Sequence, residues 1–412
     1  MFEPVRRLPL LVFCLALGQT AGWGTTYYMP SVLAPALARD LGLDATGIYL
    51  GVTIMVGLGG LAAPLAGRLL DAHGAARFLP VGPLAIGLGH LLIATIPTVA
   101  MWYAAWALFG VGMAFGLTLA VNTFLSRFVG RAARRQIGIV ALLAGFAPTL
   151  FWPLTAVLEA RYGWRGTLAI YAGLELLLIL PLQLWIGHVW PDRIAIPDDE
   201  DGGSQDQPAP APLSPRTRTI AIVAMVIAFT TQGFASWGLP VHVITLFQTL
   251  GLDHASAVGV AAASGAATIA ARGLEVGLGH RLHPLTTTGL AIAVLAPMLA
   301  LLGSPVDPLT SAWIFILVWS GANGILGVLR VTLPLYLFGA HTYGTLMGRM
   351  SLPQNLSFAA APAVFAMVIE ASGPQAALSM AILASLTALV AAIVLARIAQ
   401  PPKGPALPPT PH

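Results

Sequence analysis

Twelve long apolar stretches constrain this chain more than any other feature of its sequence. An α-helix needs about 20 mostly apolar residues to cross the ~30 Å hydrocarbon core of a bilayer. That length places predicted crossings in two groups of six. The first group lies near residues 9–31, 46–67, 78–97, 100–124, 136–157 and 166–188, and the second near 218–240, 255–278, 285–303, 309–331, 345–368 and 374–396.

The composition excludes the soluble classes of protein. Only 9% of the 412 residues are charged, whereas soluble domains carry about 25%. A chain so poor in charge cannot cover a water-facing surface, so it is neither an ordinary soluble enzyme nor a disordered protein. Its single cysteine, Cys14, cannot form an intramolecular disulfide, which excludes a disulfide-stapled secreted domain.

The basic residues predict the orientation. When loops are assigned alternately from a cytoplasmic N-terminus, 16 of the 20 basic residues fall inside and 3 outside, with Arg272 left in a span. Basic residues near span ends stay in the cytoplasm. The sequence therefore predicts a multi-pass protein of the cytoplasmic (inner) membrane with both termini cytoplasmic and an uncleaved first span. The net charge of +4 reflects this topology and indicates no nucleic-acid partner.

The predicted fold class is all-α, a polytopic membrane protein with twelve transmembrane helices in two pseudo-symmetric six-helix bundles. The expected units are an N-terminal half (1–189), a disordered cytoplasmic linker (190–217), a C-terminal half (218–399) and a disordered cytoplasmic tail (400–412). The linker is acidic and rich in proline, and it offers nothing that could pack.

An internal repeat supports the division into halves. The sequence Leu-Gly-Leu-Asp at 41–44 recurs unchanged at 250–253, an offset of 209. Parallel six-span halves related by an axis along the membrane normal form a transporter architecture, with the substrate site near the midplane between them. The same offset pairs Gly112 with Gly321, Leu117 with Leu326, Thr123 with Thr332, Gly130 with Gly339 and Pro153 with Pro362.

The segment after the second span carries a specific motif. Gly67, Asp71 and Gly74 match the pattern Gly-x3-Asp-x2-Gly. Basic residues usually follow this pattern directly, but here two alanines come first and Arg77 is the first basic residue. Over essentially its whole length the chain resembles the major facilitator superfamily, in which this loop is a signature. The resemblance implies that these four residues form a latch between cytoplasmic helix ends. The alternative is an ordinary loop aspartate at a helix C-terminus.

Two further features bear on the branch of the superfamily. Drug/proton antiporters carry a basic residue in the middle of span four, and this span has no charge. Of their span-five signature, only Gly145 and Pro148 are present. A lone arginine in span eight resembles the oxalate/monocarboxylate carriers instead.

Charged residues inside spans are candidates for function, because each costs roughly 2.5 to 3.5 kcal/mol at the helix centre. Arg272 lies near the midplane of span eight, on one helix face with Ser264, Thr268 and Glu275. Its planar fork of donors fits a carboxylate. Two interpretations stay open: an anchor for an anionic substrate with Glu275 as its partner or proton acceptor, or a structural Arg272–Glu275 pair.

Two more charged residues have alternative roles. Glu175 in span six has very apolar neighbours, so it is either a proton-coupling group or a neutral, hydrogen-bonded acid. Arg330 lies near the inner end of span ten and is either a second anion contact or an orientation-setting charge.

The resemblance implies that spans one, four, seven and ten line the transport path. Neutral donors beside aromatic rings suit a small, partly apolar solute. Packing between helices is the competing explanation for each residue. The candidate substrate-binding residues besides Arg272 are Trp23, Thr26, Tyr27, Asn122, Trp237 and Asn323.

These observations predict a secondary active transporter that moves a small organic solute, an organic anion such as a monocarboxylate, by alternating access. Proton coupling stays open. An exporter of drugs or other toxic compounds is the alternative, and a transport-inactive membrane sensor or assembly partner is a rival of another class. We find no catalytic constellation and no motif for a metal or cofactor, and we expect a monomer.

Overall fold

The structure is a computed structural model that describes residues 8–96, 98–129, 133–190, 214–278, 283–338 and 343–399. The predicted tail and most of the predicted linker lie outside these ranges. Within the described residues the secondary structure is helical throughout, apart from turns and caps.

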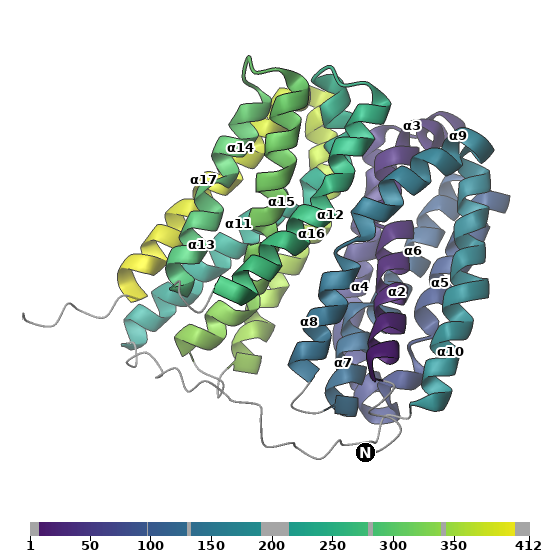
Figure 1. Ribbon diagram of the computed structural model, residues 1–412, viewed down its shortest axis with the longest axis horizontal. Helices are drawn as coiled ribbons and strands as arrows, with labels where there is room; N and C mark the ends of the chain where they lie inside the picture. Colours follow the sequence, from purple (N-terminus) through teal and green to yellow (C-terminus); the bar gives the residue numbers. More distant parts are fainter. Residues whose placement is uncertain are drawn as a thin grey trace, which may run out of the picture.

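The helices form two bundles side by side (Figure 1). The N-terminal bundle contains α2 (Leu8–Thr25), α3 (Pro30–Leu41), α4 (Ala45–His73), η1 (Ala75–Arg77), α5 (Val81–Thr95), α6 (Val99–Gly116), α7 (Thr118–Val129), α8 (Ala133–Ala144), α9 (Ala147–Gly173), η3 (Leu174–Ile179) and α10 (Leu180–Val189). The C-terminal bundle contains α11 (Pro215–Thr249), α12 (His254–Leu278), α13 (Pro284–Ala293), α14 (Leu295–Leu302), α15 (Pro308–Phe338), α16 (Tyr343–Ser372) and α17 (Pro374–Ala399).

The described helices account for twelve crossings. Eleven segments are long and apolar enough to span a membrane, but one of them, Arg135–Val189, has 55 residues. As one straight helix it would be ~80 Å long, far more than a bilayer requires. Gly163 turns the chain within it, at φ 66° and ψ 175°, so this segment crosses twice. The prediction of an all-α fold with twelve spans is confirmed.

The Gly163 turn is tied to the first span. After it, the Trp164 indole donates a hydrogen bond to Asp40 at 2.9 Å, and Arg165 forms an ion pair with the same carboxylate at 3.6 Å. Asp40 lies near the end of α3. The tripeptide Gly163-Trp164-Arg165 therefore joins the turn between spans five and six to the end of span one.

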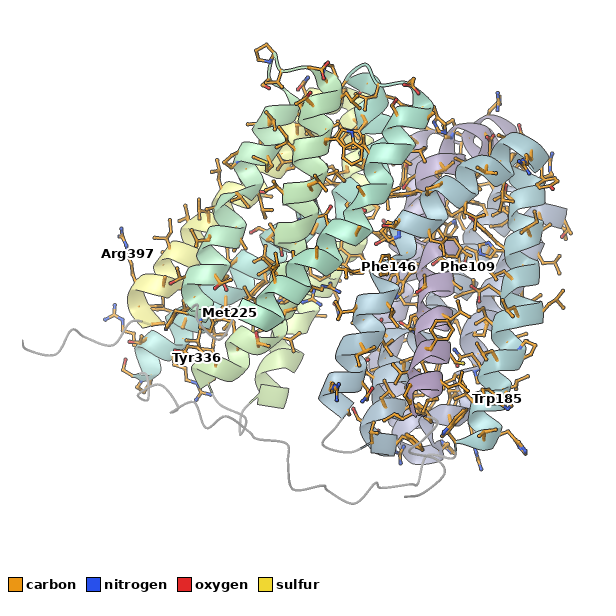
Figure 2. All side chains as sticks on the ribbon, in the orientation of Figure 1. Phe109, Phe146, Trp185, Met225, Tyr336 and Arg397 are labelled. Carbon is orange, nitrogen blue, oxygen red and sulfur yellow. The ribbon has the colours of Figure 1, made fainter. Side chains whose placement is uncertain are left out.

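Close packing inside and apolar side chains outside suit a membrane. Phe109 lies inside the N-terminal bundle (Figure 2) and is fully buried. A side chain at Gly51 would collide with the Trp106 indole at 2.4 Å, so glycine permits that helix contact. Large apolar residues such as Leu61 and Leu177 are exposed by 72% and 80%. Such exposure is costly in water and favourable in lipid.

The repeat of 209 residues is visible in the helix caps. Gly42 and Gly251 both have positive φ, 66° and 105°, and each is followed two residues later by an aspartate that caps a helix. The Asp44 carboxylate accepts from the Gly47 backbone at 2.6 Å, and the Asp253 carboxylate accepts from Ser256 at 3.0 Å. Hydrogen bonds from the Ser256 side chain and backbone lower the pKa of Asp253.

The same offset relates the contacts between the two bundles. It carries Ala45, where α4 begins, to His254, where α12 begins. Helix α4 packs on α16 of the other bundle, and α12 packs on α9. Thr149 of α9 donates to the carbonyl of Ala262 on α12 at 2.5 Å. The halves therefore meet through two equivalent helix pairs around a central space.

Candidate functional site

A cavity of about 320 Å³ lies between the two bundles. Both halves contribute side chains to it, which is the position predicted for a substrate site. Its lining residues are Gln19, Trp23, Tyr27, Tyr28, Thr118, Asn122, Ile137, Val140, Ala141, Ala144, Gly145, Ser236, Trp237, Pro240 and Arg272.

The first span is broken where it borders this cavity. Helix α2 ends at Thr25 and α3 begins at Pro30, so the residues between them are non-helical or turn residues. Proline at the first position of α3 lacks a backbone donor and does not continue α2. The break brings Tyr27 and Tyr28 to the cavity wall.

Aromatic rings form one wall. Trp237 of α11 lies 5.9 Å from Trp23 and 5.3 Å from Tyr27, both edge to face. The Tyr27 hydroxyl donates to the Trp237 backbone carbonyl at 2.5 Å, which joins the two halves. Behind Trp237, the Phe358 ring stacks at 5.5 Å, and the Arg330 guanidinium lies 5.3 Å from the centre of that ring.

Arg272 supplies the positive charge of the cavity. It is half-buried and donates from Nε to the carbonyl of Gly324 and from Nη1 to that of Ala141, both at 3.3 Å. Gly324 belongs to the C-terminal half and Ala141 to the N-terminal half, so the side chain bridges them. Among the described residues, no ion pair joins Arg272 to Glu275. The described contacts therefore give no support to a structural pair at these two positions.

Two polar clusters border the cavity, one in each half. In the N-terminal half, Thr118 donates to the Gln19 side chain at 3.2 Å. In the C-terminal half, the Gln232 amide donates to Asn323 and to Ser236, both at 2.6 Å. Ser236 also donates to the Asn323 side-chain oxygen. These bonds orient the amides and leave a polar border beside the aromatic wall.

The predicted substrate-binding residues separate into two groups. Five of them line the cavity: Trp23, Tyr27, Asn122, Trp237 and Arg272. Two others do not. Thr26, in the break after α2, is fully buried and donates to the Gly22 carbonyl of α2 at 2.5 Å. Asn323 lies in the cluster with Gln232.

Span five contributes residues that the sequence did not reveal. Ile137, Val140 and Ala144 have no chemical signature, and Ala141 acts through its backbone carbonyl. That carbonyl lies in the last turn of α8, where the partial negative charge of a helix favours a cation. Any side chain would offer the same carbonyl, so no pattern could predict this contact.

Glu175 lies away from the cavity in a buried setting. It sits in η3, a π-helical turn, with 1% exposure, and it accepts a hydrogen bond from Thr25 at 3.2 Å. Thr25 is the last residue of α2. His90, on the neighbouring helix α5, is also buried. Neither of its ring nitrogens has a hydrogen-bond partner among the described residues. Glu175 thus touches the broken first span without reaching the substrate space.

The predicted latch residues lie around the end of α4. Gly74 ends the helix with φ 94°, a backbone conformation that favours glycine. Gly67 is not required in the same way, because a side chain there would meet nothing within 4 Å. Asp71 and Arg77 are exposed. Arg127 of α7 donates to the backbone carbonyl of Asp71 at 2.9 Å. The described link between α4 and α7 therefore uses the backbone of Asp71.

A second set of contacts joins the halves at the end opposite Leu8. The Glu370 carboxylate of α16 accepts from the backbone of Ala45 at 2.6 Å and of Thr46 at 3.3 Å, and also from the Thr46 hydroxyl. The Tyr49 hydroxyl donates to the Val241 carbonyl at 3.0 Å. A carboxylate at the first turn of α4 meets the positive end of that helix. These contacts hold this end of the molecule together.

Comparisons with known proteins agree with this architecture. The chain resembles a crystal structure of a bacterial homologue of the human lysosomal transporter Spinster, in an inward-facing and occupied conformation. The TM-score is 0.70 at 14% identity, over 97% of each chain. That likeness shows a shared transporter fold.

Two curated proteins match shorter segments. An uncharacterized 38 kDa protein in the 23S RNA operon of Thermoproteus tenax is 32% identical over 165 residues, which are 39% of this chain and 42% of that protein. The puromycin resistance protein pur8 of Streptomyces alboniger is 29% identical over 156 residues, 37% of this chain and 31% of that protein. The chain matches less than half the length of either relative.

A family model gives the broadest match. The model of the Major Facilitator Superfamily covers residues 11–362, which includes nearly all of the N-terminal half and most of the C-terminal half. The motif after span two, the twelve helices and the cavity between the bundles agree with this match. The chain belongs to the Major Facilitator Superfamily.

Proposed function

We propose that this protein is a secondary transporter that moves a small organic anion, such as a monocarboxylate, by alternating access. The observation that carries the proposal is Arg272, which lines the cavity and whose hydrogen bonds among the described residues go to backbone carbonyls alone. Carbonyls accept hydrogen bonds but do not neutralise a cation. A substrate carboxylate would supply the missing charge and match the guanidinium fork.

The aromatic wall suggests the rest of the substrate. Trp23, Tyr27 and Trp237 offer ring faces and edges to the cavity, and Asn122 adds a neutral polar group. Such a lining suits an apolar or aromatic body attached to the anionic group. We therefore expect carboxylates with a hydrophobic part to bind better than small, strongly hydrated ones.

The bridge from Arg272 connects binding with movement. Its bond to Ala141 joins the two halves, so a carboxylate that takes over the guanidinium would compete with that bond. Rocking of two bundles around a midplane site is the motion that this architecture allows. Substrate binding would then loosen one contact between the halves.

Uptake into liposomes tests this proposal. The full-length chain is reconstituted, and uptake of labelled aliphatic and aromatic monocarboxylates is measured with and without a pH gradient. Arg272→Lys should reduce uptake at least tenfold, because an ammonium group keeps the charge and loses the planar fork. Arg68→Lys, at an exposed position of α4, is the control. Unaltered uptake by Arg272→Lys would refute the anchor.

A second candidate function is export of toxic compounds. Its support is the similarity to the puromycin resistance protein and the aromatic lining, which also suits neutral amphipathic molecules. In that case neutral or cationic compounds would be transported, and Arg272→Gln would leave their transport unchanged. Stimulation of uptake by an inward proton gradient would in addition support proton coupling.

A further inference from the structure

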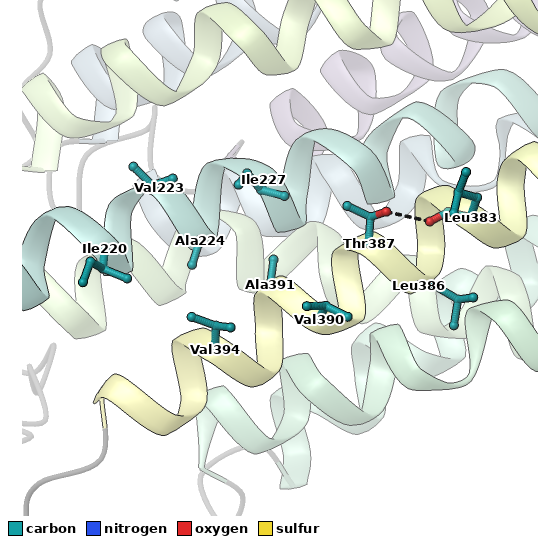
Figure 3. A pocket seen from close by; sticks show the side chains of 10 residues that line it. All are labelled: Ile220, Val223, Ala224, Ile227, Leu383, Leu386, Thr387, Val390, Ala391 and Val394. Carbon is teal, nitrogen blue, oxygen red and sulfur yellow. Dashed lines mark hydrogen bonds between the residues drawn. The ribbon is translucent and has the colours of Figure 1, made fainter.

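An apolar groove runs along the outside of the C-terminal bundle, between α11 and α17 (Figure 3). Its volume is about 540 Å³. Ala224 and Ala391 are buried at its floor, and larger apolar side chains stand on both sides. The remaining lining residues are Ile220, Val223, Ile227, Leu383, Leu386, Thr387, Val390 and Val394.

The length of the groove matches one leaflet of a bilayer. On α17 the lining runs from Leu383 to Val394, a rise of ~16 Å along the helix axis. Half of the ~30 Å hydrocarbon core is about 15 Å. One extended acyl chain of a single leaflet therefore fits along the groove.

Two arginines stand at one end of the groove. Arg216 precedes Ile220 by one helical turn, and Arg397 follows Val394 by one turn, so both lie on the groove faces of their helices. Both are exposed, and Figure 2 shows Arg397 at the end of α17. Arg218 instead lies over the Phe338 ring at 5.7 Å. Positive charge therefore meets the groove where an acyl chain would join its headgroup.

We propose that this groove is a binding site for an anionic phospholipid, with one acyl chain between α11 and α17 and the phosphate held by Arg216 and Arg397. Guanidinium groups bind phosphate through paired hydrogen bonds. A symmetric dimer through this face would bring four arginines to the same depth, so the charge favours a lipid over a second copy. The site is separate from the cavity and independent of the transported substrate.

Lipid titration of the full-length chain in a neutral detergent tests the site. Phosphatidylglycerol and phosphatidylcholine with the same acyl chains are compared by thermal unfolding and by native mass spectrometry. Phosphatidylglycerol should raise the unfolding midpoint and stay bound as a single adduct. Each arginine replaced by glutamine should weaken its binding about fivefold, and Arg216→Gln with Arg397→Gln about 25-fold.

Matched variants separate this site from general attraction to charge. Arg68→Gln with Arg135→Gln removes the same charge from exposed positions of the other half and should keep the lipid bound. Ala391→Phe fills the groove and should release the lipid, whereas Ala104→Phe, at an exposed position of α6, should not. If Ala391→Phe fails to fold, lipid binding by the Arg216→Gln/Arg397→Gln variant, compared with its control pair, tests the site.

Three results would overturn the proposal. Phosphatidylcholine carries the same phosphate beside a quaternary ammonium, so equal stabilisation by this lipid would show that the two arginines do not select a headgroup of net negative charge. Equal loss of binding in the control pair would show a non-specific effect of charge. A dimer that Ala391→Phe dissociates would assign the groove to a second copy of the chain.

Discussion

Arg272 and Glu175 are both ionisable residues inside the membrane, yet their surroundings differ. Arg272 lines the cavity and reaches across it to Ala141, whereas Glu175 is buried behind the cavity against Thr25. Placing a charged group inside the membrane costs free energy, and the two residues have different partners that offset it. Arg272 lies beside a polar space and hydrogen-bonds to two backbone carbonyls, whereas Glu175 accepts one hydrogen bond in an apolar setting.

Substitution of Glu175 separates its two interpretations. Glu175→Gln keeps an oxygen that accepts from Thr25, so stability and uptake should stay close to the original values. Glu175→Leu leaves the Thr25 hydroxyl without this partner and should cost about 1 to 3 kcal/mol of stability, seen as a lower unfolding midpoint. If Glu175→Gln folds normally but loses uptake driven by a pH gradient, the carboxyl carries the coupling proton instead.

Glycines at the closest helix contacts are expected to be necessary for the bundles to pack. Helices α5 and α6 approach so closely at Gly82 and Gly116 that a Cβ on Gly116 would lie 2.1 Å from the Gly82 Cα. Gly116→Ala should therefore greatly reduce the amount of folded protein in the membrane. The control Gly138→Ala meets nothing within 4 Å and should stabilise α8 by about 1 kcal/mol. Folded yield by size-exclusion chromatography tests both, and normal yield of Gly116→Ala would contradict this packing.

The contact of Glu370 with the start of α4 acts as a closure at one end of the molecule. The carboxylate accepts from the backbone of Ala45 and Thr46, near the positive end of the helix. Glu370→Gln removes the charge and should shift the population of this closed state by about two- to fivefold, since such interactions are worth about 0.3 to 1 kcal/mol.

Distance measurements between spin labels on α4 and α16 would detect that shift. Exposed positions near the two helix ends carry the labels. A second variant, Glu159→Gln, changes a carboxylate of α9 that makes no hydrogen bond among the described residues and serves as the control. Identical distance distributions for Glu370→Gln and the original chain would show that this contact does not hold the end closed.

Over the whole molecule, the sequence predicted more of the fold than of the site. The twelve spans follow from apolar length, because a bilayer of fixed thickness requires it, and the two halves follow from the repeat of 209 residues. Pro30 marks the break after Thr25, but prolines also occur inside unbroken spans, so the proline alone does not predict a break. The contact from Arg272 to the Ala141 carbonyl depends on packing between the halves. The sequence predicted cavity residues that have distinctive side chains, such as Trp23 and Arg272. It did not predict a contact made by a backbone carbonyl, such as that of Ala141.

The family match and the cavity leave the charge of the substrate as the central question. A compound panel of matched carboxylates and amides addresses it directly, since each pair differs in charge and little in shape. Thermal unfolding of the purified full-length chain reports binding. We predict that a carboxylate such as phenylacetate raises the unfolding midpoint, that phenylacetamide does not, and that Arg272→Gln removes the difference. Equal stabilisation by both compounds, or an unchanged carboxylate response in Arg272→Gln, would contradict the assignment of Arg272 as the anion anchor.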